Sequence, residues 1–380
     1  MYHLTEIYER YWKGFMEESG SYIAPRVFKA VNQTMACRTA KLGVSVYQCP
    51  GCEERKVVYH SCKNRFCPRC GYTETEAWGE RLLGKLGPIR HHHVTFTLPE
   101  KILPITYKYP RRVYDSLFKA ATSVLKDWFM YKHKMVPGIV AVLHTAGFAL
   151  KRHIHLHVLV TGGGIQNGRW KELERNYLTR LDFFRDRFRW EFEHNLLLAL
   201  RLPRTGSPSG ELSEGYCGGE TTEAELKRLF IELNKNRWVV AVQKGIYQPE
   251  QIVRYIGRYI KRAPLSEYKI KSIDDGTVSF ECKDYRQSVG GKPRPVVVVL
   301  PAHEFMQRLT NHVPLEGFHM VRYYGAYCKQ TVRTVLPHRQ SWRKMQIEHR
   351  GDDPLLCPHC GSEMVYCGME FPERTYAKTG

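Results

Sequence analysis

Residues His153-Ile-His-Leu-His157, followed by Val158-Leu-Val-Thr161 and three glycines, decide the fold of this chain. Histidine alternates with apolar residues here, and this period of two predicts a β-strand. Successive side chains of a strand point to opposite faces, so the three imidazoles share one side. We therefore expect His153, His155 and His157 to converge on one cation that polarises a phosphate. Imidazole binds several divalent ions, so the residue type alone does not name the metal.

A second informative stretch, Tyr255-Ile-Gly-Arg-Tyr259, lies in an expected helix at residues 250–262 that prolines bound at both ends. Tyr255 and Tyr259 share one face, and Gln251 lies one turn earlier on the same line. An apolar stripe occupies another face (Ile252, Ile256, Ile260), and cations flank the tyrosines (Arg254, Arg258, Lys261, Arg262). Paired tyrosines on a helix are more often packing residues, but this offset and these cations favour nucleophiles beside DNA.

A tyrosine nucleophile needs assistance because the pKa of its phenol is near 10. A metal ion on the phosphate and nearby cations supply it, and covalent attack conserves the phosphodiester energy for rejoining. Gly257, in the middle of the same helix, lowers helix propensity by ~1 kcal/mol. We expect another backbone or DNA to approach closely at this glycine.

The composition favours a globular protein with a polyanionic partner. Of 380 residues, 43% are hydrophobic and 25% charged, which excludes wholesale disorder and allows several domains. The 58 lysines and arginines exceed the 38 acidic residues, and a net charge of +20 favours nucleic acid or an acidic membrane surface over a merely basic protein. No apolar run approaches the ~18 residues that span a bilayer, and no secretory signal opens the chain. We expect a soluble, cytoplasmic protein.

Two CxxC turns predict a structural zinc site. Cys49-Pro-Gly-Cys52 and Cys67-Pro-Arg-Cys70 can each direct two thiolates at one ion and together complete a tetrahedron. Three further residues lie nearby in the sequence, Cys37, His60 and Cys62. They could bind a second ion or be ordinary packing residues. The basic loop residues Lys63, Arg65 and Arg69 suit either phosphate contact or a solvated loop.

Cys357-Pro-His-Cys360 supplies half of another zinc site near the end of the chain. Cys367 or Cys328 could complete it, which makes this a candidate second zinc. A reducing compartment favours zinc over disulfides for these cysteines.

The periodicity predicts an α+β fold. Helices are expected at residues 1–35, 111–133, 171–200 and 223–234, and strands at 93–98, 139–144, 154–161, 238–243 and 296–300, the last being the final core strand. The Gly-, Ser- and Pro-rich stretch 201–222 reads as a link or insertion.

These motifs together resemble the insertion sequence 91 type of rolling-circle transposases. His155-Leu-His157 and the following Val-Leu-Val-Thr-Gly-Gly-Gly resemble the HUH motif of rolling-circle nucleases, and Tyr255-Ile-Gly-Arg-Tyr259 resembles the two-tyrosine motif of these transposases. The segment Ser61-Cys-Lys-Asn-Arg-Phe-Cys-Pro-Arg-Cys70 resembles their zinc-binding module, and Phe96-Thr-Leu-Pro, Leu143-His-Thr and residues 317–325 fit as well. Phe66 departs from the pattern because relatives often place a histidine there, so this position cannot be a ligand.

The resemblance implies an HUH single-strand DNA endonuclease and strand transferase that forms a 5'-phosphotyrosine. Tyr255 and Tyr259 would be the nucleophiles, and His155 and His157 would bind catalytic Mg²⁺ or Mn²⁺. The third ligand stays open: Gln251 fits geometrically, with His153 and His93 as rivals. The partners would be single-stranded or hairpin DNA at transposon ends and target DNA, in the nucleoid of a bacterial or archaeal cell.

This interpretation divides the chain into four parts. They are an N-terminal helical arm (1–36), a zinc-binding DNA-binding module (37–85), an HUH nuclease domain with an antiparallel sheet flanked by helices (86–300, with an insertion at about 165–236) and a basic C-terminal extension (301–380). The alternatives are a plasmid replication initiator or relaxase of the same chemistry, and a non-enzymatic zinc-finger DNA-binding protein.

Overall fold

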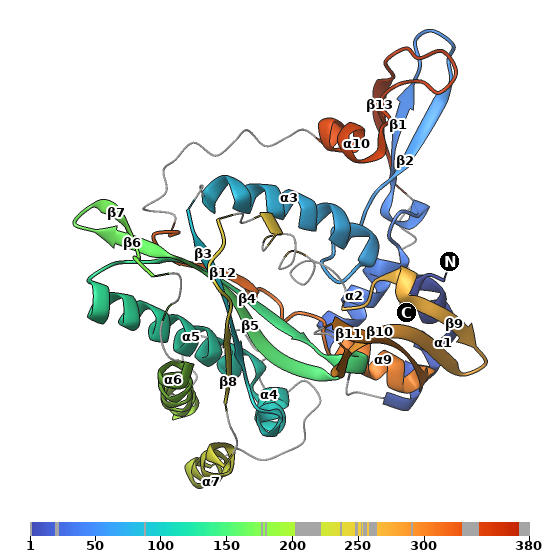
Figure 1. Cartoon of the computed structure of the whole chain (residues 1–380). Helices are drawn as coiled ribbons and strands as arrows, with labels where there is room; N and C mark the ends of the chain where they lie inside the picture. Colours follow the sequence, from blue (N-terminus) through green and yellow to red (C-terminus); the bar gives the residue numbers. More distant parts are fainter. Residues whose placement is uncertain are drawn as a thin grey trace.

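The computed structural model has an α+β fold built around a five-stranded antiparallel sheet, which confirms the predicted fold class (Figure 1). It describes residues 2–19, 23–86, 89–175, 178, 181–201, 222–235, 238–247, 250, 251, 253, 257, 264–289, 292–328 and 342–371. Of the stretch predicted as a link at 201–222, residues 202–221 lie outside the described part of the chain.

The central sheet has the strand order β12-β4-β5-β3-β8, and each neighbouring pair is antiparallel. Its strands are β3 (His91–Thr97), β4 (Gly138–Ala146), β5 (Arg152–Thr161), β8 (Val239–Val242) and β12 (Val321–Gly325). Four of them confirm predicted strands, whereas β12 was not predicted. The strand with the alternating histidines is β5, and it lies in the middle of the sheet.

One face of the central sheet carries the main apolar core. Phe96, Leu156 and Val158 are fully buried on this face, where they belong to the same cluster as Phe188 and Leu117. The covering helices are α4 (Leu103–Lys108), α5 (Pro110–His133), α6 (Leu181–Arg201) and α7 (Glu223–Asn234). The helices α5 and α7 confirm predicted helices, whereas α4 was not predicted. The helix predicted at 171–200 begins only at Leu181, and its first residues, up to Glu172, form a strand instead. In α7 a capping box of Thr222 and Glu225 fixes the first turn.

The opposite face of the central sheet packs under α3 (Pro68–Leu86). Trp78 and Leu82 of this helix form a buried cluster with Val142 and Leu159 of the sheet, and the cluster includes Val253. Figure 1 shows α3 crossing above the central strands, while α5 and α6 lie on the other side. The alternation of β5 therefore separates an apolar face from a histidine-bearing face.

A second antiparallel sheet joins the N-terminal helices to a later part of the chain. It consists of β9 (Ile270–Asp274), β10 (Thr277–Val289) and β11 (Lys292–Pro301) in the order β11-β10-β9. Helices α1 (Leu4–Ser19), α2 (Pro25–Met35) and α9 (Ala302–Thr310) share its core, which includes Tyr8, Phe280 and Phe305. The hydroxyl of Tyr11 donates to the carbonyl of Asp274 at 2.8 Å.

This arrangement corrects two predictions. The sequence predicts Val296–Leu300 as the last core strand, but β11 belongs to the second sheet, and β12 is the later strand of the central sheet. The division at residue 300 is also wrong, because α9 packs with α1 and β12 pairs with β4. An edge strand that pairs from a distant point of the chain leaves no local signal of its partner.

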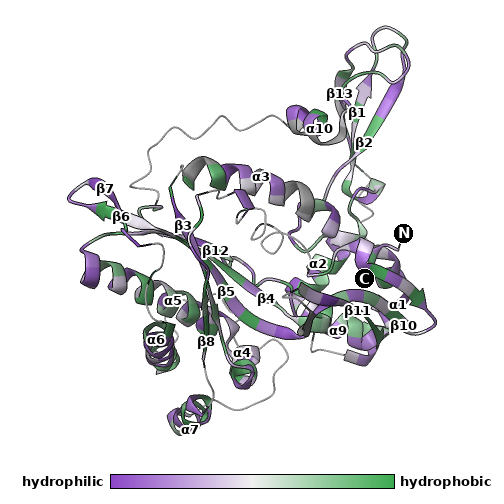
Figure 2. Cartoon of the chain, viewed as in Figure 1, coloured by the Kyte–Doolittle hydropathy of each residue, from purple (hydrophilic) through white to green (hydrophobic). Residues whose placement is uncertain are grey.

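A third sheet forms a head that projects from the rest of the molecule in Figure 1. It has the order β13-β1-β2, from β1 (Val44–Gln48), β2 (Arg55–Tyr59) and β13 (Val365–Glu370), and α10 (Trp342–Arg350) lies beside it. Strands β6 (Gly163–Gln166) and β7 (Arg169–Glu172) form a separate hairpin. Short 3-10 turns complete the described elements: Ala40–Leu42, Glu100–Ile102, Phe148–Leu150 and Glu267–Lys269. In Figure 2 the residues of α10 are mostly hydrophilic, as expected of a helix at the surface.

Candidate active site and cysteine clusters

Three histidines from two neighbouring strands converge on one face of the central sheet. The register places His144 of β4 directly opposite His155 of β5, and His157 lies two residues further along β5 on the same face. His155 Nε2 lies 2.9 Å from His144 Nδ1 and 3.1 Å from His157 Nε2. One ligand nitrogen from each of the three lies within 4.8 Å of the other two, so they can bind one ion together.

In each of the two β5 histidines, the Nδ1 atom, which points away from the shared centre, contacts another polar group. His155 Nδ1 lies 3.1 Å from the carbonyl oxygen of His153, and His157 Nδ1 lies 3.0 Å from His93 Nε2. The side chain of Gln243 in turn hydrogen-bonds His93. Hydrogen bonds on one ring nitrogen orient the other toward a metal. Both histidines thus present Nε2 to the shared centre.

Burial keeps these imidazoles neutral at physiological pH. Burial, together with the neighbouring histidines, lowers the pKa of His155 to about 4 and that of His157 to about 2. The pKa of His144 is also well below its ordinary value, for the same reasons. Neutral imidazole is the form that binds metal. The cluster is therefore chemically ready to bind a cation without first releasing protons.

The predicted tyrosine helix contacts the same face of the sheet. Glu250, Gln251, Val253 and Gly257 are helical. Val253 is buried against the sheet and α3, and a Cβ on Gly257 would meet the Thr75 side chain of α3 at 3.2 Å. This contact agrees with the close backbone approach that the glycine predicts. The tyrosines Tyr255 and Tyr259, the flanking cations Arg254, Arg258, Lys261 and Arg262, and the isoleucine stripe lie outside the described residues.

His144 is the member of the cluster that the sequence prediction missed. Among the predicted third ligands, His93 hydrogen-bonds His157 from behind, and His153 lies outside the group of three. Gln251 is helical and exposed. A signal for His144 exists in Leu143-His-Thr, but it is one histidine on an otherwise apolar strand. Only the pairing of β4 with β5 makes it part of the site.

The first cysteine cluster lies where α2 ends and α3 begins. It consists of Cys37, Cys62, Cys67 and Cys70, whose Sγ atoms all lie within 4.8 Å of one another. Cys70 Sγ lies 3.5 Å from Cys37 Sγ and 3.6 Å from Cys62 Sγ. The N–H of Cys62 donates to Cys37 Sγ at 3.4 Å. Four thiolates in this geometry suit a tetrahedral structural zinc.

The second cysteine cluster joins Cys49 and Cys52 to Cys357 and Cys360. The prediction of one ion shared by Cys49, Cys52, Cys67 and Cys70 is therefore wrong, because the two CxxC pairs belong to different clusters. Each pair has partners that local spacing cannot identify. Cys328 and Cys367 belong to neither cluster within the described residues. His60 hydrogen-bonds Ser45 and the carbonyl of Leu42 instead of joining a thiolate group.

The basic loop before α3 lies at the first cysteine cluster. Lys63 is exposed and has φ of 52°, while Arg65 and Arg69 are half-buried. Lys63 is therefore the most accessible of the three to a phosphate, and its role in DNA contact stays a prediction.

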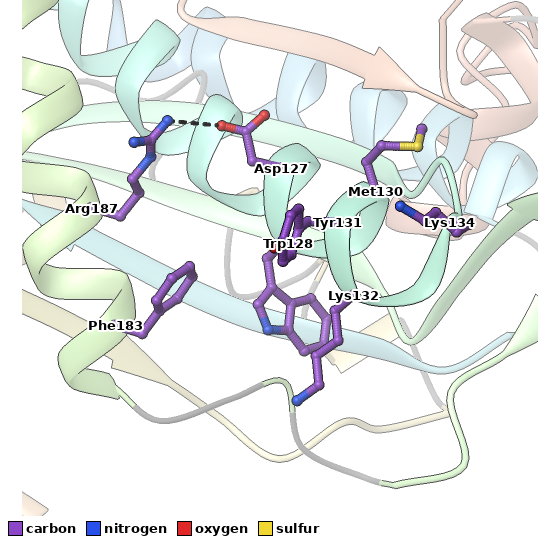
Figure 3. A pocket seen from close by; sticks show the side chains of 8 residues that line it. All are labelled: Asp127, Trp128, Met130, Tyr131, Lys132, Lys134, Phe183 and Arg187. Atoms are coloured by element: carbon purple, nitrogen blue, oxygen red, sulfur yellow. Dashed lines mark hydrogen bonds and ion pairs between the residues drawn. The ribbon is translucent and has the colours of Figure 1, made fainter.

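A hollow of about 780 Å³ lies at the junction of α5 and α6, away from the histidine cluster. Figure 3 shows Trp128, Phe183 and Arg187 around it, with Arg187 bonded to Asp127 at 3.4 Å. The helices that line it cover the apolar face of the central sheet, whereas the histidines occupy the other face. We therefore place the candidate active site at the histidines.

Two family models and two relatives match this chain. A model described as "Putative transposase" matches residues 138–334, and one described as "Transposase zinc-binding domain" matches residues 7–98. "Putative transposase y4qJ" of Sinorhizobium fredii is 33% identical over 401 residues, with 98% of each chain covered. "Transposase for insertion sequence element IS801" of Pseudomonas savastanoi pv. phaseolicola is 28% identical over 376 residues, covering 93% of this chain and 86% of the relative.

No solved structure matches the chain. In the part of the chain that the structure describes, no helix has both the length and the apolar character to cross a membrane. The zinc-binding match contains the whole first cysteine cluster, which supports a structural zinc there. The chain belongs to the insertion sequence 91 type of transposases and carries their zinc-binding domain at its N-terminus.

Proposed function

We propose that this transposase cleaves and joins single-stranded DNA ends by metal-dependent attack of a tyrosine. The observation that carries the proposal is the convergence of three neutral imidazoles on one sheet face, the same face against which Val253 packs, two residues before Tyr255 in the sequence. A transposase must break and rejoin phosphodiester bonds, and a covalent intermediate retains the energy for the second step.

The donor set fits a divalent cation. His144, His155 and His157 would hold Mg²⁺ or Mn²⁺ through ring nitrogens, and Mn²⁺ is better suited because Mg²⁺ prefers oxygen ligands. When bound, the cation polarises the scissile phosphate as a Lewis acid. His93 and the carbonyl of His153 act as positioning groups that keep Nε2 of each β5 histidine directed at the ion.

Tyr255 or Tyr259 supplies the nucleophile. The phenol loses its proton, the bond from Oη to phosphorus forms, and the bond from phosphorus to the 3' oxygen breaks. The 3' oxygen takes up a proton and leaves as the free 3'-OH of the upstream fragment, while the downstream fragment stays attached through its 5' phosphate as a phosphotyrosine. The second tyrosine then serves the second cleavage or the strand transfer.

The described neighbours of the tyrosines support this placement. Val253 and Gly257 are helical and bring their helix against α3 on the histidine-bearing side of the sheet. Tyr255 and Tyr259 alternate with these residues in the sequence. Each tyrosine is thus two residues in sequence from a described residue that contacts this side.

The DNA partner follows from the charge and from the chemistry. A net charge of +20 favours binding to phosphates, and cations beside the tyrosines would guide one strand to them. Single-stranded or hairpin DNA at the transposon ends is the expected substrate, because the nucleophile and the ion must both reach one backbone phosphate. The full-length similarity to transposases argues against a plasmid initiator, a relaxase or a non-enzymatic zinc-finger protein.

The test is the formation of a covalent adduct on a single-stranded transposon end labelled at its 3' terminus. Wild-type protein with Mn²⁺ should carry the label after denaturation. Tyr255→Phe and Tyr259→Phe should each reduce the adduct, and the double variant should form none. Tyr131→Phe is the matched control, because Tyr131 is 86% exposed on α5, beyond the opposite face of the sheet. An undiminished adduct in the double variant would refute the proposal.

A further inference from the structure

The second cysteine cluster brings together two segments that lie far apart in the sequence. Cys49 and Cys52 lie in the turn between β1 and β2, whereas Cys357 and Cys360 lie between α10 and β13. Cys49 Sγ is 3.4 Å from Cys360 Sγ, and Cys52 Sγ is 3.5 Å from Cys357 Sγ, although each pair is separated by more than 300 residues. These distances are too long for a disulfide, whose S–S bond is about 2.0 Å. They approach the ~3.8 Å expected between thiolates that lie 2.3 Å from a tetrahedral zinc.

The two CxxC turns have the same backbone geometry. In each, the first cysteine donates its N–H to the carbonyl five residues later, and the residue four positions later donates back to the carbonyl of that cysteine. The bonds are Cys49 to Glu54 at 2.9 Å and Glu53 to Cys49 at 3.0 Å, and correspondingly Cys357 to Ser362 at 2.9 Å and Gly361 to Cys357 at 3.0 Å. The fourth residue after the first cysteine has a positive φ in both turns, 60° at Glu53 and 73° at Gly361.

The strand pairing around the turns also corresponds. Gln48 pairs with Arg55 across the first turn, and Leu356 pairs with Glu363 across the second, at the same spacing from the cysteines. Two matching turns of this kind direct four thiolates at one point, an arrangement that suits a tetrahedral zinc ion.

The buried core between the two segments is small without an ion. Strands β1 and β13 pair over a short antiparallel ladder with a bulge at Val46 and Tyr47. Among the described residues, the buried apolar cluster here consists of Met364 with Cys49 and Cys357, and Tyr47 packs against it. Lys56 Nζ donates to the carbonyl of Pro354 at 2.6 Å. A core this small rarely folds without a metal or a cross-link.

We propose that Cys49, Cys52, Cys357 and Cys360 bind a zinc ion of their own, which clamps residues 342–371 onto the N-terminal hairpin of the zinc-binding domain. The zinc-binding match ends at residue 98 and the other match at residue 334, so neither contains Cys357 or Cys360. The head is thus completed by the C-terminus and holds a second zinc. This inference does not depend on the tyrosine mechanism.

The two cysteine clusters should differ in how easily they lose their ions. Cys37, Cys67 and Cys70 are buried, whereas Cys52 and Cys360 are exposed. A chelator should therefore remove the ion of the head before that of the first cluster. The order in which the two ions are lost to the chelator therefore indicates which cluster each ion came from.

The test is the number of thiolate-bound ions per full-length chain. Wild-type protein should bind two zinc ions through thiolates, and after cobalt substitution the thiolate-to-cobalt absorption should correspond to two sites. The histidine cluster does not contribute to this absorption because it has no thiolate. Cys357→Ser/Cys360→Ser should bind one thiolate-bound ion and lose half of the absorption. Cys328→Ser/Cys367→Ser is the matched control and should retain both.

Limited proteolysis gives a second readout that does not require counting metal. Residues 342–371 should become cleavable in Cys357→Ser/Cys360→Ser, and in wild-type protein after mild chelation, while the central sheet stays protected. One thiolate-bound ion in the wild type would overturn the proposal. So would two thiolate-bound ions in the Cys357→Ser/Cys360→Ser variant, or unchanged protection of residues 342–371 in it.

Discussion

The two faces of the central sheet use the same strands for opposite purposes. On β5, Leu156 and Val158 are fully buried among apolar residues under α5 and α6, while His155 and His157 alternate with them toward α3. The apolar face stabilises the fold through the area it removes from water. The histidine face buries groups whose pKa values are lowered by that burial, which costs stability and prepares a cation site.

Because the two faces differ in this way, substitutions at neighbouring positions of one strand should affect different properties of the protein, either its stability or its DNA cleavage. A substitution on the apolar face should reduce stability and leave the chemistry of the folded protein intact. A substitution on the histidine face should do the reverse. Residues one position apart on β5 are therefore matched controls for each other.

The largest expected effect is that of His157→Ala on DNA cleavage. Loss of one of three ligands should lower the cleavage rate by at least about 100-fold, more than the loss of a group behind a ligand. The midpoint of urea unfolding should change little. Cleavage of a labelled single-stranded end, measured across Mn²⁺ concentrations, checks this, and cleavage at the wild-type rate in EDTA would contradict the metal site.

Leu156→Ala should give the complementary result. Leu156 has no exposed surface, so the truncation leaves a cavity and should lower the free energy of unfolding by about 2–5 kcal/mol. Urea denaturation should show a lower midpoint with an unchanged slope. Below the unfolding transition the variant should still cleave DNA. If Leu156→Ala lost cleavage while it remained folded, the two faces would not be separate in function.

A smaller effect is expected at His93, which hydrogen-bonds His157 from behind. His93→Phe should weaken Mn²⁺ binding by about 10–100-fold, and excess Mn²⁺ should restore cleavage, unlike in His157→Ala. His153→Ala should weaken Mn²⁺ binding less. His153 contacts His155 Nδ1 through its backbone carbonyl, which the substitution retains. Calorimetric titration with Mn²⁺ checks the order. A greater loss in His153→Ala would make His153 a ligand.

The smallest expected effect is on the pH dependence of stability. Burial lowers the pKa of His91, on the histidine-bearing face, to about 4. Between pH 6.5 and 4 the unfolded chain therefore binds a proton that the folded chain does not, so stability falls as the pH falls. In His91→Gln, the decrease in the free energy of unfolding from pH 7 to pH 5 should be smaller than in the wild type by on the order of 1–2 kcal/mol. Urea midpoints of both proteins at pH 7 and pH 5 measure it, and equal losses would contradict the prediction.

The sequence by itself determined the elements and the local chemistry. The alternation at 153–157 predicted β5 and the shared face of His155 and His157, because side-chain direction in a strand depends only on position. Helical periodicity predicted α5 at 110–133 and α7 at 223–234 nearly to their ends. The CxxC pairs predicted zinc because two thiolates in one turn are a local arrangement.

Only the tertiary structure decided which distant residues meet. His144 joins the site because β4 pairs with β5 in one register, and a shift by one residue would turn it to the apolar face. The same holds for the cysteines, since both CxxC pairs have equivalent local geometry, and strand and helix placement assigns Cys67 to Cys37 but Cys49 to Cys360. Sequence specifies direction along an element, whereas contact between elements depends on the packing of the whole chain.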